Sequence, residues 1–185
     1  MALVHFPVVN KHAETVAAAV TNLDLHDIAR SAKTYGVKSF HVVTPLSDQK
    51  RLVERIVDHW VHGAGARYNP KRREALELIR IAESLAEVSE RIQALGGGRP
   101  QTVVTTASAT ARSIGYGALR ELLGSGKSHL LIFGTAWGLA PEVVRDADFV
   151  LEPVRGGTSY NHLSVRCAAA IIMDRLMAEP IEMTS

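Results

Sequence analysis

Short apolar runs alternate along this chain with longer stretches in which apolar residues recur every three or four positions. The short runs predict buried β-strands at residues 3–9, 39–44, 101–106, 130–133 and 149–154. The longer stretches predict helices at residues 24–36, 47–63, 74–95, 111–123 and 162–177. The alanine-rich stretch 11–20 fits either a helix or an open turn. Strands and helices in alternation predict an α/β fold with a parallel sheet flanked by helices.

Capping residues set the expected limits of several helices. Asp24 is the expected N-cap of the first helix, and Gly36 is expected to end that helix. Pro141 opens a further short helical turn. Cys167 lies in the apolar stretch of the last helix, where we expect it to be a small buried side chain.

The segment 130–173 has the pattern strand, loop, strand, loop, helix. Gly134 and Gly138 lie in the first loop, and Gly156 and Gly157 lie in the second. Loops that follow parallel strands meet at one edge of the sheet, where α/β proteins bind their ligands. The sequence therefore predicts a ligand site in this segment.

Composition adds a few constraints. The chain has 185 residues, 46% of them hydrophobic and 22% charged, so we expect one globular domain spanning residues 1–185. A net charge of +2 permits an RNA partner without demanding one. A single cysteine excludes a disulfide framework and fits the cytoplasm. No apolar run reaches the roughly 20 residues of a membrane span, and the first residues lack the features of a signal peptide. We expect a cytoplasmic protein with no membrane partner.

Common cofactor and metal motifs are absent. A GxGxxG dinucleotide motif would follow the first strand, but the sequence there, PVVNKHAE, contains no glycine. The GSGK at residues 124–127 lacks the frame of a P-loop. The eight histidines are scattered, so we expect no metal site. There is no GxSxG motif, although composition leaves a Ser-His-Asp triad open.

Three segments, in chain order, have a specific resemblance. They are NLDLHDIARSAKTYGV at residues 22–37, FGTAWGL at 133–139, and SYNHLSVRCAAAIIMDRL at 159–176. They resemble the first, second and third signature motifs of the SPOUT superfamily of RNA methyltransferases. The match extends over nearly the whole chain, and the full pattern is most similar to a bacterial group of uncharacterised members that use S-adenosylmethionine.

The resemblance implies a five- or six-stranded parallel sheet whose C-terminal part forms a deep trefoil knot. It also implies S-adenosylmethionine as cofactor, bound in a bent form against three loops at the strand ends. The implied cofactor-binding residues are Thr105, Thr106, Phe133, Gly134, Thr135, Gly138, Leu139, Leu151, Pro153, Ser159, Asn161, His162 and Leu163. These residue types suit S-adenosylmethionine, because glycines let the backbone approach a ligand closely and leucines can form an apolar slot for adenine.

Arg30 lies where the family has its functional arginine, and the resemblance makes His26 and Asp27 candidate proton acceptors beside it. His26 and Arg30 are four residues apart, so they share a helix face. Each of these residues, taken alone, fits a helix cap or a surface position equally well.

A basic group follows a glycine-rich loop and consists of Arg67, Lys71, Arg72 and Arg73. These cations fit a contact with an RNA backbone or a solvated helix start equally well. Tyr68 and Trp60 are near them, and aromatic rings of this kind can stack on a base.

Three functions remain open at this point. The first is an RNA methyltransferase acting on tRNA or rRNA as a homodimer, with an active site drawn from both chains. The second is a catalytically silent RNA-binding protein that keeps the cofactor pocket. Two departures from the family pattern bear on the choice, since Ala136 stands where many relatives have Glu and Asp24 stands where an Asn is usual. The third is an α/β domain that binds another nucleotide.

Overall fold

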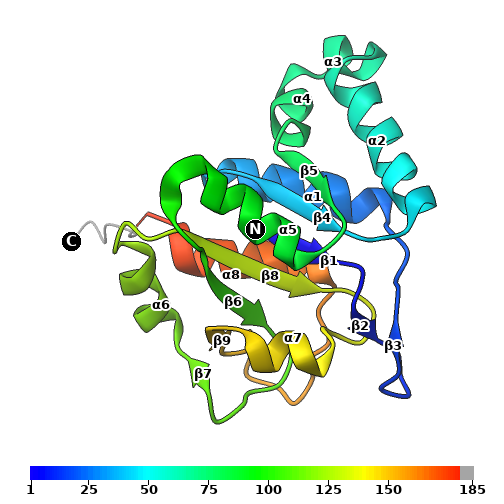
Figure 1. Ribbon diagram of the computed structural model, residues 1–185. Helices are drawn as coiled ribbons and strands as arrows, with labels where there is room; N and C mark the ends of the chain where they lie inside the picture. The colour runs from blue at the N-terminus through cyan, green and yellow to red at the C-terminus, as the bar shows by residue number, and fades with distance from the viewer. Residues whose placement is uncertain (180–185) are drawn as a thin grey trace.

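The computed structural model describes residues 1–179 (Figure 1). Its main sheet has seven strands in the order β5-β4-β1-β8-β6-β9-β7, and every neighbouring pair is parallel. Their bounds are β1 Ala2–Val4, β4 Phe40–Val43, β5 Ile79–Ala82, β6 Gln101–Thr105, β7 Ser113–Ile114, β8 His129–Gly134 and β9 Phe149–Leu151. A separate antiparallel pair joins β2 Val8–Val9 to β3 Thr15–Val16. The predicted α/β class and parallel sheet are confirmed, with seven strands rather than five or six.

Eight α-helices connect these strands within residues 1–179. They are α1 Asn22–Thr34, α2 Ser47–Val61, α3 Ala64–Tyr68, α4 Pro70–Leu76, α5 Leu85–Ile92, α6 Tyr116–Leu123, α7 Pro141–Asp146 and α8 Val165–Met177. A π-helical turn, η1 Gln93–Gly97, follows α5. Each of these helices is too short or too polar to cross a membrane.

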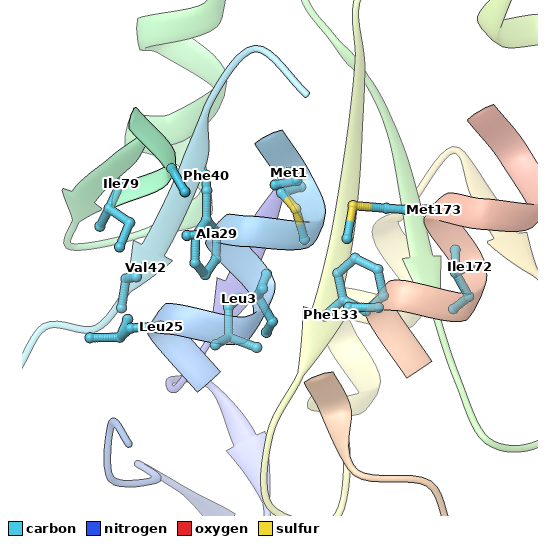
Figure 2. Packing of buried hydrophobic residues seen from close by; sticks show 14 of the residues in the cluster. Met1, Leu3, Leu25, Ala29, Phe40, Val42, Ile79, Phe133, Ile172 and Met173 are labelled. Atoms are coloured by element: carbon cyan, nitrogen blue, oxygen red, sulfur yellow. The ribbon is translucent and has the colours of Figure 1, made fainter. Parts of the chain in front are cut away.

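Alternate strand residues form two apolar layers, one on each face of the sheet. Figure 2 shows Leu3 and Phe40 packed near α1, and Phe133 beside Met173 of α8. The neighbouring strand residues point to the opposite face, where Val4 and other strand side chains pack with α5 and α7. Helices therefore cover both faces, and the strand ends are left to form sites.

One predicted helix, 74–95, is wrong. The segment contains the end of α4, then β5, then α5. The four residues Ile79–Ala82 are too few to distinguish a helical from a strand period, so the apolar spacing on either side extended the prediction through them. Ser84 begins α5 by accepting a hydrogen bond from the backbone N–H of Glu87 at 3.2 Å.

Other element limits also differ from the predictions. The run 3–9 is divided into β1 and β2, and 149–154 ends at Leu151. Residues 111–123 contain β7 before α6 begins at Tyr116, and the stretch 11–20 contains β3 and no helix. The helix predicted from residue 162 begins at Val165.

Two predictions about helix residues are corrected. The N-cap of α1 is Thr21 rather than Asp24, because the Thr21 side chain accepts from the Asp24 backbone N–H at 3.2 Å. Cys167 is exposed rather than buried, since the sheet-facing residues of α8 are Ala169, Ile172 and Met173 and residue 167 lies outside that face. The trefoil knot stays a prediction.

Candidate active site

A cleft of about 820 Å³ opens at the carboxyl ends of β6 and β8. Three loops line it: the residues after β6, the residues after β8, and the residues that lead into α8. The segment that enters α1 completes the wall with Ala18, Thr21 and Asp24. This is the position that parallel α/β sheets use for ligands, and the volume lies in the range of small-molecule sites.

The loop after β8 is held close to the sheet. Gly134 ends β8, and a Cβ there would lie 2.7 Å from the backbone nitrogen of Leu139 and 2.9 Å from its Cγ. Thr135 Oγ1 donates to the carbonyl of Val4 at 2.9 Å. Strand β2 holds the far end of the loop, because Val9 N–H donates to the Gly138 carbonyl at 2.9 Å. Only glycine at 134 permits this fold of the loop.

Ala136, in the same loop, has a φ of +52°. The left-handed conformation costs a residue other than glycine about 1–2 kcal/mol, so surrounding contacts have to maintain it. The neighbouring Trp137 supplies one such contact, because its N–H donates to the Val9 carbonyl at 3.0 Å, and its side chain is 67% exposed beside the cleft.

The other two loops are joined directly. Asn161 Nδ2 donates to the carbonyl of Ala107 at 2.7 Å, which ties the loop before α8 to the loop after β6. Thr105 Oγ1 donates to the Ile132 carbonyl at 3.1 Å. Ser164 caps α8 by accepting from the N–H of Cys167 at 3.3 Å. The second Ser of the third motif therefore caps the last helix, which begins at Val165.

Most of the predicted cofactor residues line this cleft. They are Thr105, Thr106, Phe133, Gly134, Thr135, Gly138, Leu139, Asn161, His162 and Leu163.

Three predicted cofactor residues lie elsewhere. Leu151 is fully buried in the core, and Pro153 is buried outside the lining of the cleft. Ser159 lines a smaller adjoining cavity of about 450 Å³ with Arg155 and Tyr160.

Arg166 is a functional candidate in the cleft that the sequence alone did not indicate. It lines the cleft from α8 and lies 3.4 Å from Asp24 Oδ1 and 3.5 Å from Asp27 Oδ2, both on α1. Thr21 Oγ1 donates to the other oxygen of Asp24 at 2.6 Å. A cation in the first turn of α8 was the available sequence signal, and its partners on a distant segment were not visible.

The three candidate catalytic residues lie on α1, outside the cleft lining. Arg30 is exposed, and Asp27 pairs with Arg166. The ring of His26 lies edge-on to Trp60 at 5.3 Å between centroids. Burial lowers the pKa of His26, and the nearby Arg72 lowers it further, so His26 is neutral at neutral pH. Within one chain these residues do not converge on the ligand cleft.

His5 lies fully buried just after β1, next to the segment that enters the cleft wall. Its carbonyl accepts from the N–H of Ala18, which lines the cleft, at 2.7 Å. Both ring nitrogens lack a hydrogen-bond partner, and burial lowers the pKa of His5 to about 4. Among residues 1–179, no group of three or more His, Cys, Asp or Glu side chains is placed to bind a metal ion.

Comparison with solved structures shows the same fold in several methyltransferases. A TrmH/SpoU tRNA modifying enzyme from A. aeolicus is 18% identical, with a TM-score of 0.56 over 96% of this chain and 73% of the other. An AdoMet-bound rRNA methyltransferase from Sinorhizobium meliloti is 19% identical, with a TM-score of 0.52 over 95% of this chain and 54% of the other.

Curated relatives are considerably more similar in sequence. A tRNA (guanine-N(1)-)-methyltransferase from Oleidesulfovibrio alaskensis is 44% identical over 97% of this chain, and one from Nitratidesulfovibrio vulgaris is 46% identical over 96%. The chain spans only 42% and 41% of the lengths of these two relatives. An uncharacterized protein from Aquifex aeolicus is 37% identical over 96% of this chain and 87% of its own length.

The family model described as SAM-dependent RNA methyltransferase matches residues 1–178. That match covers nearly the whole chain and includes all three loops of the cleft. The chain belongs to this family of RNA methyltransferases, whose cofactor is S-adenosylmethionine.

Proposed function

We propose that this chain transfers a methyl group from S-adenosylmethionine to a nucleotide of tRNA or rRNA, with tRNA as the first class to test. The observation that supports this most directly is the cleft itself, built from three loops at the strand ends as the family resemblance implies. The fold of its structural neighbours and the family match agree with the proposal.

The cleft suits the cofactor by its chemistry. The loop that begins at Gly134 lines the cleft with its backbone, Leu139 and Leu163 offer apolar walls, and Thr106 and Asn161 offer polar groups. Bound S-adenosylmethionine would supply a methyl group activated by its positively charged sulfur. The three loops would hold the donor in place and exclude water from it.

The methyl transfer itself requires little from the chain beyond positioning the donor and the acceptor. Transfer would join an oxygen or nitrogen of the acceptor nucleotide to the methyl carbon and break the carbon–sulfur bond, whose electron pair would stay on sulfur. The acceptor loses a proton to a base or to water. His26, neutral at neutral pH, and Asp27 are the candidate bases, and Arg30 would hold a phosphate or orient the attacking group.

We propose a homodimer because the candidate catalytic residues lie outside the cleft of their own chain. Arg30 would act at the cleft of the second copy. The outer face of α8, where Cys167 is exposed and Ala170 and Ile171 are partly exposed, is a suitable contact surface for that copy. Mixing Arg30→Ala chains with Gly134→Val chains tests this, because only a shared active site would restore activity in the mixture. A mixture as inactive as its components would contradict the shared site.

The acceptor atom named for the curated relatives is not assigned to this chain. The activity for which those relatives are named belongs to proteins of which this chain spans about two fifths. The decisive measurement is transfer of labelled methyl groups to total tRNA and total rRNA, followed by mass spectrometry of the nucleosides. A single new methylated nucleoside is expected. Cofactor binding without transfer to either RNA pool would favour the silent RNA-binding function, and absence of cofactor binding would contradict both.

A further inference from the structure

The region around α3 and α4 carries cations and an exposed aromatic ring that the cleft does not use. Residues 61–73 contain Arg67, Lys71, Arg72 and Arg73 and no acidic residue. Figure 1 shows α2, α3 and α4 grouped at the top of the view, with α3 outermost. Tyr68, the last residue of α3, is 86% exposed. Core packing therefore does not explain an aromatic residue at this position.

Close packing around the Trp60 ring fixes the geometry of this region. The guanidinium of Arg72 lies 4.5 Å from the ring centroid of Trp60, in a cation–π contact. Gly65 lies against the same ring, because a Cβ there would be 2.7 Å from Trp60 Cε3. His26 and His59 approach the ring edge-on at 5.3 and 5.2 Å. Arg72 is thus held in position, and a stacked guanidinium keeps N–H donors for another partner.

The cations in this region are only weakly neutralised. Lys71 pairs with Glu74 at 3.0 Å, but the Lys71 side chain is 88% exposed, and exposed pairs exchange easily for another anion. Arg73 pairs with Glu77, so its charge is less available to a ligand. Arg67 makes no ion pair with any of residues 1–179.

Helix α1 connects this region to the cleft. It packs against α4, while Asp24 in its first turn lines the cleft, and its length is about 18 Å. The hydrogen bond from Lys71 holds the pKa of Glu74 below its ordinary value, and Lys33 of α1 adds to the effect. Cations of α1 and α4 therefore lie near one another. Arg30 and Lys33 extend positive charge along α1, whereas Asp24 and Asp27 lie at its cleft end beside Arg166.

We propose that Arg67, Tyr68, Lys71 and Arg72 form a second RNA contact, the α3–α4 surface, outside the catalytic cleft. The cations hold phosphates, and Tyr68 stacks on an unpaired base of the substrate. This combination of cations with an exposed aromatic ring is the one by which proteins bind unpaired nucleotides. The inference rests on the proposed function for the identity of the ligand.

A protein partner fits this surface less well. Protein interfaces have an apolar centre, whereas the apolar residues of this region, Val61, Ala66 and Leu76, are buried within it. Apart from His62 and the small apolar residues Ala64 and Pro70, what remains exposed is charge and the Tyr68 ring.

The test measures binding of the full chain to bulk tRNA by fluorescence anisotropy over a range of salt concentrations. Tyr68→Ala should weaken binding about tenfold, because stacking on one base is worth roughly that factor or more. Tyr68→Phe keeps the ring and should stay within about twofold of the unaltered chain. Arg67→Ala with Lys71→Ala should reduce the dependence of log K on log salt by about 1.4, or roughly 0.7 per phosphate contact.

The matched control removes two cations from the opposite end of the strands, Arg99→Ala with Lys127→Ala. Both are exposed and lie just before β6 and β8, so they should leave tRNA binding and its salt dependence unchanged. All altered positions are exposed, and each variant is first shown to unfold at the temperature of the unaltered chain.

Unaltered tRNA binding in Tyr68→Ala would overturn the inference, and so would equal losses in the control pair. Tight binding of inorganic polyphosphate that equals binding of tRNA and ignores Tyr68 would identify a general anion surface instead. Different results would refute the α3–α4 surface and the proposed methyl-transfer activity. Methyl transfer that is indifferent to the α3–α4 surface would refute only the inference, and surface-dependent binding without any transfer would refute only the proposed activity.

Discussion

Replacing Gly134 by alanine adds one side-chain carbon and should disrupt the loop that forms the wall of the cleft. The new Cβ of Gly134→Ala would lie 2.7 Å from the Leu139 nitrogen, so the loop must move by about 0.7 Å to reach ordinary contact. Hydrogen bonds between β2 and the loop resist this movement, because Val9 is bonded to Gly138 and to Trp137. Overpacking of this kind costs about 1–3 kcal/mol of unfolding free energy.

The same movement should weaken cofactor binding. Backbone groups of the loop that face a ligand would shift with it, and a loss of about 1.4 kcal/mol corresponds to a tenfold rise in Kd. We expect the Kd for S-adenosylmethionine to rise about tenfold or more in Gly134→Ala. Isothermal titration calorimetry gives the Kd, and urea unfolding gives the stability.

Gly117→Ala is the matched control for this change. Gly117 lies in α6, its added Cβ would meet nothing within 4 Å, and it lies outside the cleft lining. Alanine is the better helix former, so this variant should gain up to about 1 kcal/mol and keep its cofactor affinity. A destabilised Gly134→Ala with unchanged Kd would show that the loop packs as described but does not hold the cofactor. Unchanged stability and unchanged Kd would refute the tight packing itself.

Three further results are expected. Arg30→Ala should abolish methyl transfer while the Kd for S-adenosylmethionine stays unchanged, since Arg30 is exposed and outside the cleft lining; parallel loss of cofactor binding would contradict this. Arg166→Met should lower the unfolding free energy by about 1–2 kcal/mol in urea, because it leaves the carboxylate of Asp24, 7% exposed, without its cation. Burial holds the pKa of His5 at about 4 in the folded chain, below its ordinary 6.5, so only the unfolded chain takes up a proton between these values. The contribution of His5 to stability is therefore complete above pH 6.5 and falls as the pH drops toward 4, by about 1.4 kcal/mol per pH unit. His5→Leu should remove that part of the slope in urea unfolding at pH 7.5 and 5.0, and an unchanged slope would show that His5 is not the group responsible.

The sequence predicted the strands on which the site is built more reliably than the segment that follows the basic group. Strands β6 and β8 appear as apolar runs of several residues with polar or glycine-rich ends, which is a clear local signal. Strand β5 has only four residues, and its alternating pattern is compatible with the helical spacing of its neighbours. The capping pair Ser84 and Glu87 was the local signal that a new helix begins there.

The loops of the site were predictable because their residues are concentrated in short motifs, whereas the ion pairs across the site were not. Arg166 and Asp24 are 142 positions apart, so no local pattern links them. Their contact depends on the packing of α8 against α1, which is a property of the whole sheet. The exposure of Cys167 has the same origin, because the composition of a helix does not show which of its faces the sheet will cover.

The lengths of the relatives bear on where RNA contacts should be sought. The family segment occurs within much longer curated relatives, and also makes up most of the uncharacterized Aquifex aeolicus protein. Additional regions of a longer protein can contact RNA only in the relatives that possess them. The cleft loops would hold the cofactor, and α1 lies between them and the α3–α4 surface. That surface lies inside the matched region and carries the exposed cations and the ring that an RNA contact requires, which makes Tyr68 and Arg67 the first residues to test in this chain.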